Sequence, residues 1–453
     1  MNKSLFYIVV VAAIGGFLFG FDSGVISGCE KAIQSEFGLS AFWHGLIISG
    51  ALIGTVIGVF TAGRPSDRWG RKPTLWLMAV LFLVSAVGCA FTPHDATWGP
   101  HLLGWFRFIG GLAIGGVSVV VPLYIVEVSP GKYRGRLVAM NQLNIVFGIL
   151  VSYISNYLVA RFMPEADPRL IWRVMLGVEC APIALFMVLL ATIPESPRWL
   201  VRANRVEVAR GVLERIGYPE VERTLFEISD SLRAAAGGAD VALFQRRYIK
   251  PILLAFLIAF FNQVSGINAI NYYAPRIFQM IFGEGSELAA LAGTIGVGAV
   301  NLTFTLLAFL VIDRFGRRAM IIGGSAMMIL MHALVAWQLS LPTPNAAIAV
   351  TGILGFIAFF ACSSGAVIWV YISEVFPNVV RAKGQALGCF THWFMCTIIS
   401  WAFPAVAERA GTWAFAFFAA MMMVQLVWAL FFMPETKGGT IEDIEKRLGM
   451  SAL

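Results

Sequence analysis

The chain has 453 residues, of which 58% are apolar and only 13% are charged. Ordinary soluble domains carry roughly 25% charged residues, so a water-soluble fold of this length could not cover so much apolar surface, and most of the chain is expected to lie in lipid. A net charge of +7 is also typical of nucleic-acid-binding proteins. In a membrane protein the positive-inside rule explains the same excess, so no nucleic-acid partner is expected.

Twelve apolar segments are long enough to cross a bilayer, which takes about 20 residues in helical form. They lie at approximately 5–28, 42–63, 73–92, 102–125, 138–160, 171–192, 249–274, 287–311, 319–340, 346–373, 384–406 and 412–433. The sequence therefore predicts an all-α membrane protein with twelve transmembrane helices.

A charged stretch interrupts the apolar pattern between the sixth and seventh segments. It predicts four parts: an N-terminal six-helix bundle at 1–194, a cytoplasmic helical linker at 195–248, a C-terminal six-helix bundle at 249–434 and a cytoplasmic tail at 435–453. Basic residues collect after the second, fourth, eighth and tenth segments. By the positive-inside rule, these loops and both termini are cytoplasmic.

The two predicted bundles repeat three motifs. Asp-Arg-Trp-Gly-Arg-Lys at 67–72 recurs as Asp-Arg-Phe-Gly-Arg-Arg at 313–318, an offset of 246. Glu127 with Arg134 recurs as Glu374 with Arg381, an offset of 247, and Pro-Glu-Ser-Pro at 194 recurs as Pro-Glu-Thr-Lys at 434, an offset of 240. Duplicated six-helix halves of this kind indicate alternating access to a site between them.

These repeated motifs combine glycine with charges of both signs. Gly70 and Gly316 permit a tight turn, since glycine tolerates a positive φ. We expect the charged residues to form a cytoplasmic latch of ion pairs that holds the helix ends together and breaks when the halves rock apart; the alternative is that they only anchor the topology. The latch residues are Asp67, Arg68, Arg71, Glu127, Arg134, Glu195, Asp313, Arg314, Arg317, Glu374, Arg381 and Glu435.

Asp22 lies in the middle of the first apolar segment. A carboxylate there is costly and marks a functional site, and Arg107 in the fourth segment is its natural partner. Desolvation disfavours the charged carboxylate and a guanidinium favours it, so a change in their separation would bind or release a proton. The alternative is a static buried ion pair. Glu179 in the sixth segment is a second intramembrane acid.

Five motifs, in order along the whole chain, resemble the sugar porters of the major facilitator superfamily. They are Gly-Phe-Leu-Phe-Gly-Phe-Asp from 16, the duplicated Asp-Arg-x-Gly-Arg motif, Pro-Glu-Ser-Pro-Arg-Trp-Leu from 194, Gln-Val-Ser-Gly-Ile-Asn from 263 and Pro-Glu-Thr-Lys-Gly from 434. The resemblance implies one central sugar site that faces each side in turn. In the family's proton symporters the residues matching Asp22 and Arg107 form the coupling pair, whereas the human glucose facilitators carry Asn at the Asp position. Glu179 matches an acid of the xylose–proton symporter and is expected to tune Arg107.

The resemblance also implies a set of sugar contacts, namely Phe19, Gln142, Gln263, Asn268, Tyr272, Asn301, Trp369 and Trp393. Amides that hydrogen-bond hydroxyls and aromatic faces suit a sugar, although a single amide in an apolar helix often only joins helices. Three positions depart from the family. Asn262 stands where Gln is usual, and His392 stands for Asn or Gln, either as a titrating group or as a neutral imidazole. Ile149 matches the glucose facilitators rather than the xylose symporter, which favours a hexose.

The expected function is proton-coupled symport of a monosaccharide such as glucose, with xylose or galactose as further substrates, in a bacterial inner membrane. The alternatives are a passive sugar facilitator and a sugar sensor that does not transport. A Walker motif and a recognisable Ser/His/Asp set are both absent from the sequence, and its six cysteines lack metal-ligand spacing. We expect a monomer in the lipid bilayer that is not an enzyme and needs no cofactor or metal.

Overall fold

The computed structural model describes residues 2–95, 97–164, 166–236, 241–283, 285–438 and 441–448. These residues form helices, loops and turns, with no β-strand among them. Among the described residues, twelve helical stretches are long and apolar enough to cross a membrane, which confirms the twelve predicted segments. They are Lys3–Phe37, Ala41–Thr61, Arg71–Ala90, Gly99–Val128, Arg134–Phe162, Pro168–Thr192, Arg246–Phe282, Glu287–Phe315, Arg317–Leu339, Ala346–Glu374, Arg381–Glu408 and Gly411–Phe431.

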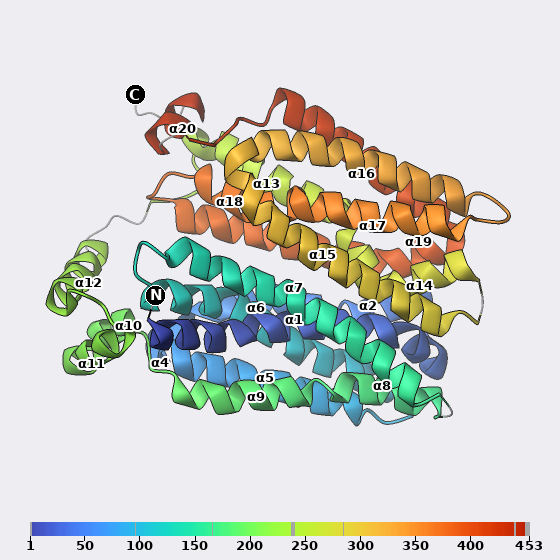
Figure 1. The fold of residues 1–453 in the computed structure, drawn as a ribbon, viewed down its shortest axis with the longest axis horizontal. Helices are drawn as coiled ribbons and strands as arrows, with labels where there is room; N and C mark the ends of the chain where they lie inside the picture. Colours follow the sequence, from blue (N-terminus) through green and yellow to red (C-terminus); the bar gives the residue numbers. More distant parts are fainter. Residues whose placement is uncertain are drawn as a thin grey trace. The chain divides into compact units, whose positions relative to one another are not determined.

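The chain divides into two compact units. The first unit contains Met1–Phe37, Gly50–Ser155 and Glu165–Asp240, and the second contains Gly38–Ser49, Asn156–Pro164 and Val241–Leu453. The α-helices of the predicted linker, which end at Ala236, therefore belong to the first unit. Figure 1 shows them in green, outside the bundle and beside the end where the first helix begins.

The first unit is built on long helices with short ones at their ends. Its helices are α1 (Lys3–Phe37), α3 (Gly50–Thr61), α4 (Gly63–Trp69), α5 (Arg71–Ala90), α6 (Gly99–Val128), most of α7 (Arg134–Phe162), α8 (Pro168–Gly177), α9 (Cys180–Thr192), α10 (Pro197–Arg202), α11 (Val206–Ile216) and α12 (Val221–Ala236). Helices α3 and α6 pack backbone to backbone, because a Cβ on Gly111 or Gly115 would collide with the carbonyl oxygens of Ala51 and Thr55. The glycines of α6 are therefore a close-packing surface.

The second unit repeats this plan. Its helices are α2 (Ala41–Ile48), the 3-10 turn η1 (Arg246–Tyr248), α13 (Ile249–Val264), α14 (Ile267–Phe282), α15 (Glu287–Phe315), α16 (Arg317–Leu339), α17 (Ala346–Cys362), α18 (Ser364–Glu374), α19 (Arg381–Phe431) and α20 (Ile441–Leu448). Helix α19 runs through two of the candidate membrane spans. The core of this unit is formed mainly by α13, α16, α18 and α19 around Tyr371 and Phe376.

Two of the membrane-spanning stretches in the second unit are broken helices. Helices α13 and α14 meet at Ser265 and Gly266, where Gly266 adopts a φ of +86°. Helices α17 and α18 meet at Ser363, whose φ of −121° and ψ of −92° are not helical. Each break frees backbone groups that a continuous helix would pair, and these groups need other partners.

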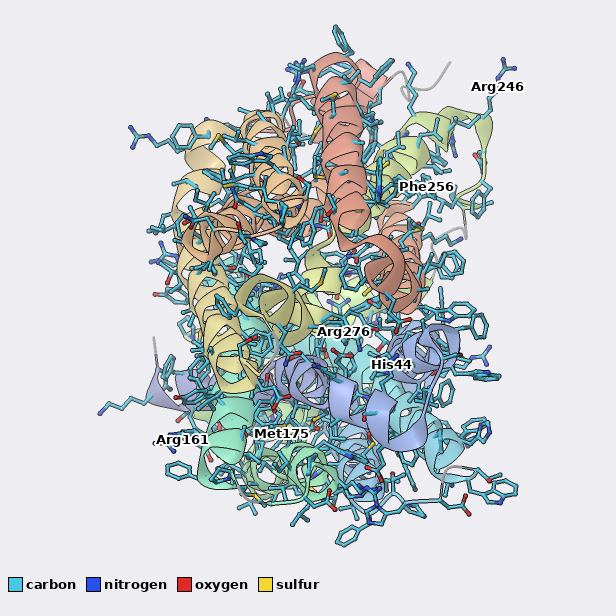
Figure 2. The ribbon with its side chains drawn as sticks, turned by 90° about the vertical axis from the view of Figure 1, so that its right-hand side faces the viewer. His44, Arg161, Met175, Arg246, Phe256 and Arg276 are labelled. Atoms are coloured by element: carbon cyan, nitrogen blue, oxygen red, sulfur yellow. The ribbon has the colours of Figure 1, made fainter. Side chains whose placement is uncertain are left out.

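The outer surface carries large apolar side chains. Figure 2 views the helices end-on and marks Phe256, which lies on α13 with 41% of its surface exposed. Leu310 and Trp413 are more than two-thirds exposed. Such a surface suits contact with acyl chains rather than with water, and with twelve apolar helices it identifies an integral membrane protein.

Candidate functional site

Asp22 and Arg107 form a buried ion pair in the first unit. Asp22 comes from α1 and Arg107 from α6, and an Arg107 Nη1–H donates to Asp22 Oδ1 at 2.7 Å. Both side chains are 1% exposed. A charge that is removed from water needs a partner of opposite sign at short distance, and each of these residues favours the charged form of the other.

Glu179 adds a second buried carboxyl to this pair. It lies where α8 gives way to α9, is 2% exposed, and its side chain lies against that of Asp22. Two carboxyls therefore share one guanidinium. If both were ionised, the group would carry one uncompensated negative charge in an apolar interior, and uptake of one proton would remove it.

A chain of side-chain amides crosses the break between α13 and α14 in the second unit. Asn268 Nδ2 donates to Gln263 Oε1 at 2.6 Å, and Gln263 Nε2 donates to Asn262 Oδ1 at 3.0 Å. In a continuous helix, residues five apart lie about 140° apart around the axis and cannot meet. The break at Ser265 and Gly266 therefore brings Gln263 and Asn268 together.

His392 and two tryptophans lie beside this amide chain. The Gln263 amide nitrogen donates to the His392 ring, lying 3.0 Å from Nδ1 and 3.2 Å from Nε2. The His392 ring packs against Trp369 at 4.9 Å and against Trp393 at 5.1 Å between centroids. Amide groups next to aromatic faces offer both kinds of contact that a sugar ring requires.

Asn262 is held mainly by the protein itself. Its Nδ2 donates to the backbone carbonyl of Ser364 at 3.0 Å, at the start of α18, while its Oδ1 accepts from Gln263. Asn262 on α13 thus joins the two broken helices of the second unit through the start of α18.

The remaining predicted sugar contacts lie on helices of both units. Gln142 is half-buried on α7, and Phe19 packs against the core of the first unit. In the second unit, Tyr272 on α14 is buried and Asn301 on α15 accepts a weak hydrogen bond from Thr305 Oγ1 at 3.4 Å. These four residues stay predicted contacts.

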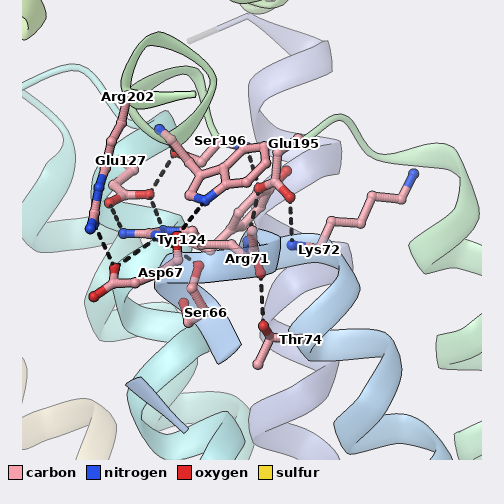
Figure 3. A network of polar contacts seen from close by, with 12 residues as sticks. Ser66, Asp67, Arg71, Lys72, Thr74, Tyr124, Glu127, Glu195, Ser196 and Arg202 are labelled. Carbon is pink, nitrogen blue, oxygen red and sulfur yellow. Dashed lines mark hydrogen bonds and ion pairs between the residues drawn. The ribbon is translucent and has the colours of Figure 1, made fainter. Parts of the chain in front are cut away.

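The first copy of the latch motifs forms one polar network within the first unit (Figure 3). Arg71 binds Glu127 through two parallel hydrogen bonds of 2.8 Å each, and its third nitrogen donates to the Ser66 carbonyl at 2.8 Å and to Asp67 at 3.3 Å. Ser196 Oγ donates to Glu127 at 2.6 Å. A bidentate arginine–carboxylate pair is the strongest geometry available to these two groups.

Glu195 caps the N-terminus of α5. Its carboxylate accepts the backbone N–H groups of Arg71 and Lys72, both at 3.1 Å. A helix N-terminus favours a negative charge. Gly70 precedes the helix with a φ of 111°, and a Cβ at that position would collide with the Glu195 carboxylate. Glycine is therefore required at position 70 for two reasons: the backbone has a positive φ, and the Glu195 carboxylate leaves no space for a Cβ.

The second copy repeats this arrangement within the second unit. Arg317 binds Glu374 at 2.9 and 3.2 Å, and Thr436 Oγ1 takes the place of the serine at 2.6 Å. Glu435 accepts the N–H groups of Arg317 and Arg318, both at 3.0 Å. Arg71 and Arg317 thus each bind a glutamate of their own unit.

The outlying latch residues take less part in these networks. Asp67 and Asp313 are exposed and bind their own Arg71 and Arg317 at 3.3 and 3.2 Å. Arg381 donates to the Phe376 carbonyl at 3.3 Å. The side chains of three further arginines are exposed, namely Arg68, Arg134 and Arg314.

The two capping glutamates differ in their acidity. Burial raises the pKa of Glu195, and its backbone hydrogen bonds offset this only in part. Burial acts in the same direction on Glu435, but four backbone N–H groups together lower its pKa below the ordinary value. The same motif therefore holds an acid of raised pKa in one unit and an acid of lowered pKa in the other.

Two hydroxyls of these networks were not predicted. Ser196 and Thr436 each follow the capping glutamate and donate to the glutamate that binds arginine. Both hydroxyls occupy the same place in the repeated Pro-Glu-Ser and Pro-Glu-Thr motifs. Alignment of the two repeats would therefore have indicated that they have the same role.

Residues 8–448 match the family model described as "Sugar (and other) transporter". The chain is 36% identical over 480 residues to the D-xylose-proton symporter of Escherichia coli (strain K12), covering 98% of this chain and 96% of that protein. It is 33% identical over 454 residues to the glucose transporter GlcP of Staphylococcus epidermidis, covering 99% of this chain and 98% of that protein.

The fold is similar to that of a solved transporter. The structure of the major facilitator superfamily proton:xylose symporter XylE bound to 6-bromo-6-deoxy-D-glucose has a TM-score of 0.79 and 33% identity, with 99% of this chain and 100% of that chain covered. Twelve membrane helices, the repeated motifs and this likeness define a membrane transporter with the major facilitator fold rather than an enzyme. The chain belongs to the sugar transporter family.

Proposed function

We propose that this protein carries a monosaccharide, preferentially a hexose, together with a proton by alternating access. The observation that carries the proposal is the buried pair of Asp22 and Arg107, with Glu179 against it. A passive carrier has no need of ionisable groups inside the apolar part of a bundle, where they are costly.

Coupling follows from the charge balance at this site. When Asp22 is ionised, it binds Arg107 and holds α1 to α6. Protonation of Asp22 neutralises its charge and frees the guanidinium to pair with Glu179. The three residues thus have two arrangements that differ by one proton, and a change of conformation that favours one of them binds or releases that proton.

The second unit supplies most of the sugar contacts in this proposal. The amides of Gln263 and Asn268 donate to and accept from hydroxyls, and Trp369 and Trp393 offer aromatic faces next to His392. The relatives are named for xylose and for glucose. Ile149, an apolar residue on α7, supports the hexose because its side chain leaves room for the group that xylose lacks.

The two arginine–glutamate networks are proposed to brace the cytoplasmic ends of the helices. The excess of basic residues on these loops supports a cytoplasmic position for both networks and both termini. With the bacterial symporter among its relatives, the protein is proposed to lie in a bacterial inner membrane. Loosening of these networks would accompany opening toward the cytoplasm.

Accumulation of labelled sugar in proteoliposomes tests the proposal. With an inward proton gradient and no other energy source, we expect labelled glucose to rise above its external concentration and a protonophore to abolish this rise. Counterflow without a gradient checks that the protein is active. Counterflow without accumulation would identify a passive facilitator, and binding without counterflow would identify a sensor.

A further inference from the structure

His332 is a buried imidazole in apolar surroundings that the transport scheme above does not use. It lies within α16, and its ring packs against Phe356 at 4.2 Å, Phe418 at 5.6 Å and Phe415 at 5.9 Å between centroids. An imidazole in such a place loses its hydration, which is costly unless a hydrogen bond replaces it. One ring nitrogen, Nδ1, has no hydrogen-bond partner in the part of the chain that the structure describes.

The other ring nitrogen binds the broken helix. His332 Nε2 donates to the backbone carbonyl of Ser265 at 2.9 Å, at the end of α13. In a continuous helix this carbonyl would accept the N–H of the residue four positions later. The positive φ of Gly266 turns the chain away at this point. The His332 side chain thus supplies the donor for a carbonyl at the break.

A second helix, α19, contacts the break through the side chain of Phe418. A Cβ on Gly266 would lie 2.5 Å from the Phe418 ring, so glycine lets this ring pack directly on the turn. The Phe418 ring also contacts His332. Helices α16 and α19 together therefore hold the turn at Ser265 and Gly266 in place.

The shape of this turn determines the geometry of the amide chain. Gln263 precedes the break and Asn268 follows it, and their 2.6 Å hydrogen bond exists only because the helix is interrupted between them. We infer that His332 is a positioning residue for substrate binding, which fixes the break by binding Ser265 and thereby holds Gln263 and Asn268 at the spacing that receives the sugar. This inference rests on the proposed function.

The simpler alternative is that His332 only fills space between α16, α17 and α19. In that case an apolar side chain of similar size would serve equally well, and only protein stability would respond to polar replacements. A positioning role instead depends on a donor at the place of Nε2. Glutamine presents its amide nitrogen at that distance, whereas asparagine is one methylene shorter and methionine has no donor.

Equilibrium binding of labelled glucose and xylose to purified variants, with thermal unfolding measured in parallel, tests the inference. His332→Met is expected to raise the dissociation constant roughly five-fold or more, as for the loss of one buried hydrogen bond. His332→Gln is expected to stay within about two-fold of the wild type. Met328→Leu, one turn earlier on the same buried face of α16, is the control that alters packing alone.

Wild-type affinity in a folded His332→Met variant would overturn the inference, as would an equal loss in His332→Gln. If the methionine variant does not fold, His332→Asn replaces it: we expect weakened binding with asparagine and retained binding with glutamine, and equal affinities would contradict a positioning role. A wild-type protein that binds no sugar of the panel would instead contradict the proposed function.

Discussion

Asn268 donates to the side-chain oxygen of Gln263 at 2.6 Å across a broken helix. The two residues are five positions apart and would face different directions on a regular helix. Their contact shows why this membrane-spanning stretch is divided: the break converts two separate amides into one polar surface inside an apolar bundle.

Gln263→Ala is expected to raise the dissociation constant for the sugar by roughly five- to a hundred-fold, since losing a buried hydrogen-bonding partner costs about 1–3 kcal/mol. Gln142→Ala, on the half-buried face of α7, should have a smaller effect. Equilibrium binding to the two purified variants measures both. Wild-type affinity in Gln263→Ala, with a lowered unfolding temperature, would mean that this amide only joins helices.

Gly70→Ala and Gly316→Ala should each destabilise the protein by about 1–3 kcal/mol, because the new Cβ requires an unfavourable φ and meets the carboxylate of Glu195 or Glu435. Thermal unfolding in detergent is the measurement. Gly63→Ala and Gly323→Ala are matched controls, since both glycines lie in helices and a Cβ there meets no atom within 4 Å. Equal melting temperatures for all four variants would contradict this account of the motif.

Arg71→Ala should lower the stability of the folded protein more than Arg317→Ala does. The partner of Arg71, Glu127, has a side chain only 4% exposed, so the substitution strands a buried carboxylate at a cost of roughly 3–5 kcal/mol. Glu374 is 26% exposed, and water replaces part of the lost interaction, which leaves a cost nearer about 1–2 kcal/mol.

Labelling of single cysteines placed at the cytoplasmic ends of the helices, together with unfolding, measures this difference. We expect labelling from the cytoplasmic side to rise in both variants, and more in Arg71→Ala. Unchanged labelling with normal transport would leave both arginines as topology anchors.

The opposite pKa shifts of the two capping glutamates predict opposite pH dependences. Glu435 has a lowered pKa in the folded state, so it stabilises the protein above the ordinary value of 4.5, and this contribution is lost as the pH falls through its folded pKa. Glu195 has a raised pKa, so the folded state holds its proton more tightly; its contribution is complete below 4.5 and is lost as the pH rises through its folded pKa.

Melting temperatures of Glu435→Gln and Glu195→Gln, recorded against pH beside the wild type, check these signs. The melting temperature of the wild type should exceed that of Glu435→Gln by a margin that grows as the pH rises toward 4.5. The corresponding margin over Glu195→Gln should shrink as the pH rises above 4.5. Parallel curves for the two variants would contradict the assignment.

Much of the fold was predictable because the length of an apolar segment and the repeat of a motif can both be read directly from the sequence. The twelve segments follow from hydropathy, and the tight turns at Gly70 and Gly316 follow from the glycine of the repeated motif. The break at Ser363 was not predicted, since Asn262 and Gln425 bind the neighbouring Ser364 from distant parts of the chain. For the same reason, the contact of His332 with Ser265 depends on how α16 packs against α13.

Proton movement driven by sugar tests the central claim most directly. Proteoliposomes that contain the wild-type protein and a pH indicator, without an imposed gradient, should take up protons when glucose is added outside, so the weakly buffered external medium should become more alkaline. Asp22→Asn should still bind and exchange sugar but should produce no alkalinisation, because it lacks the titrating carboxyl. An Asp22→Asn protein that moves protons as the wild type does, or a wild type that exchanges sugar without any pH change, would contradict proton coupling at Asp22 and Arg107.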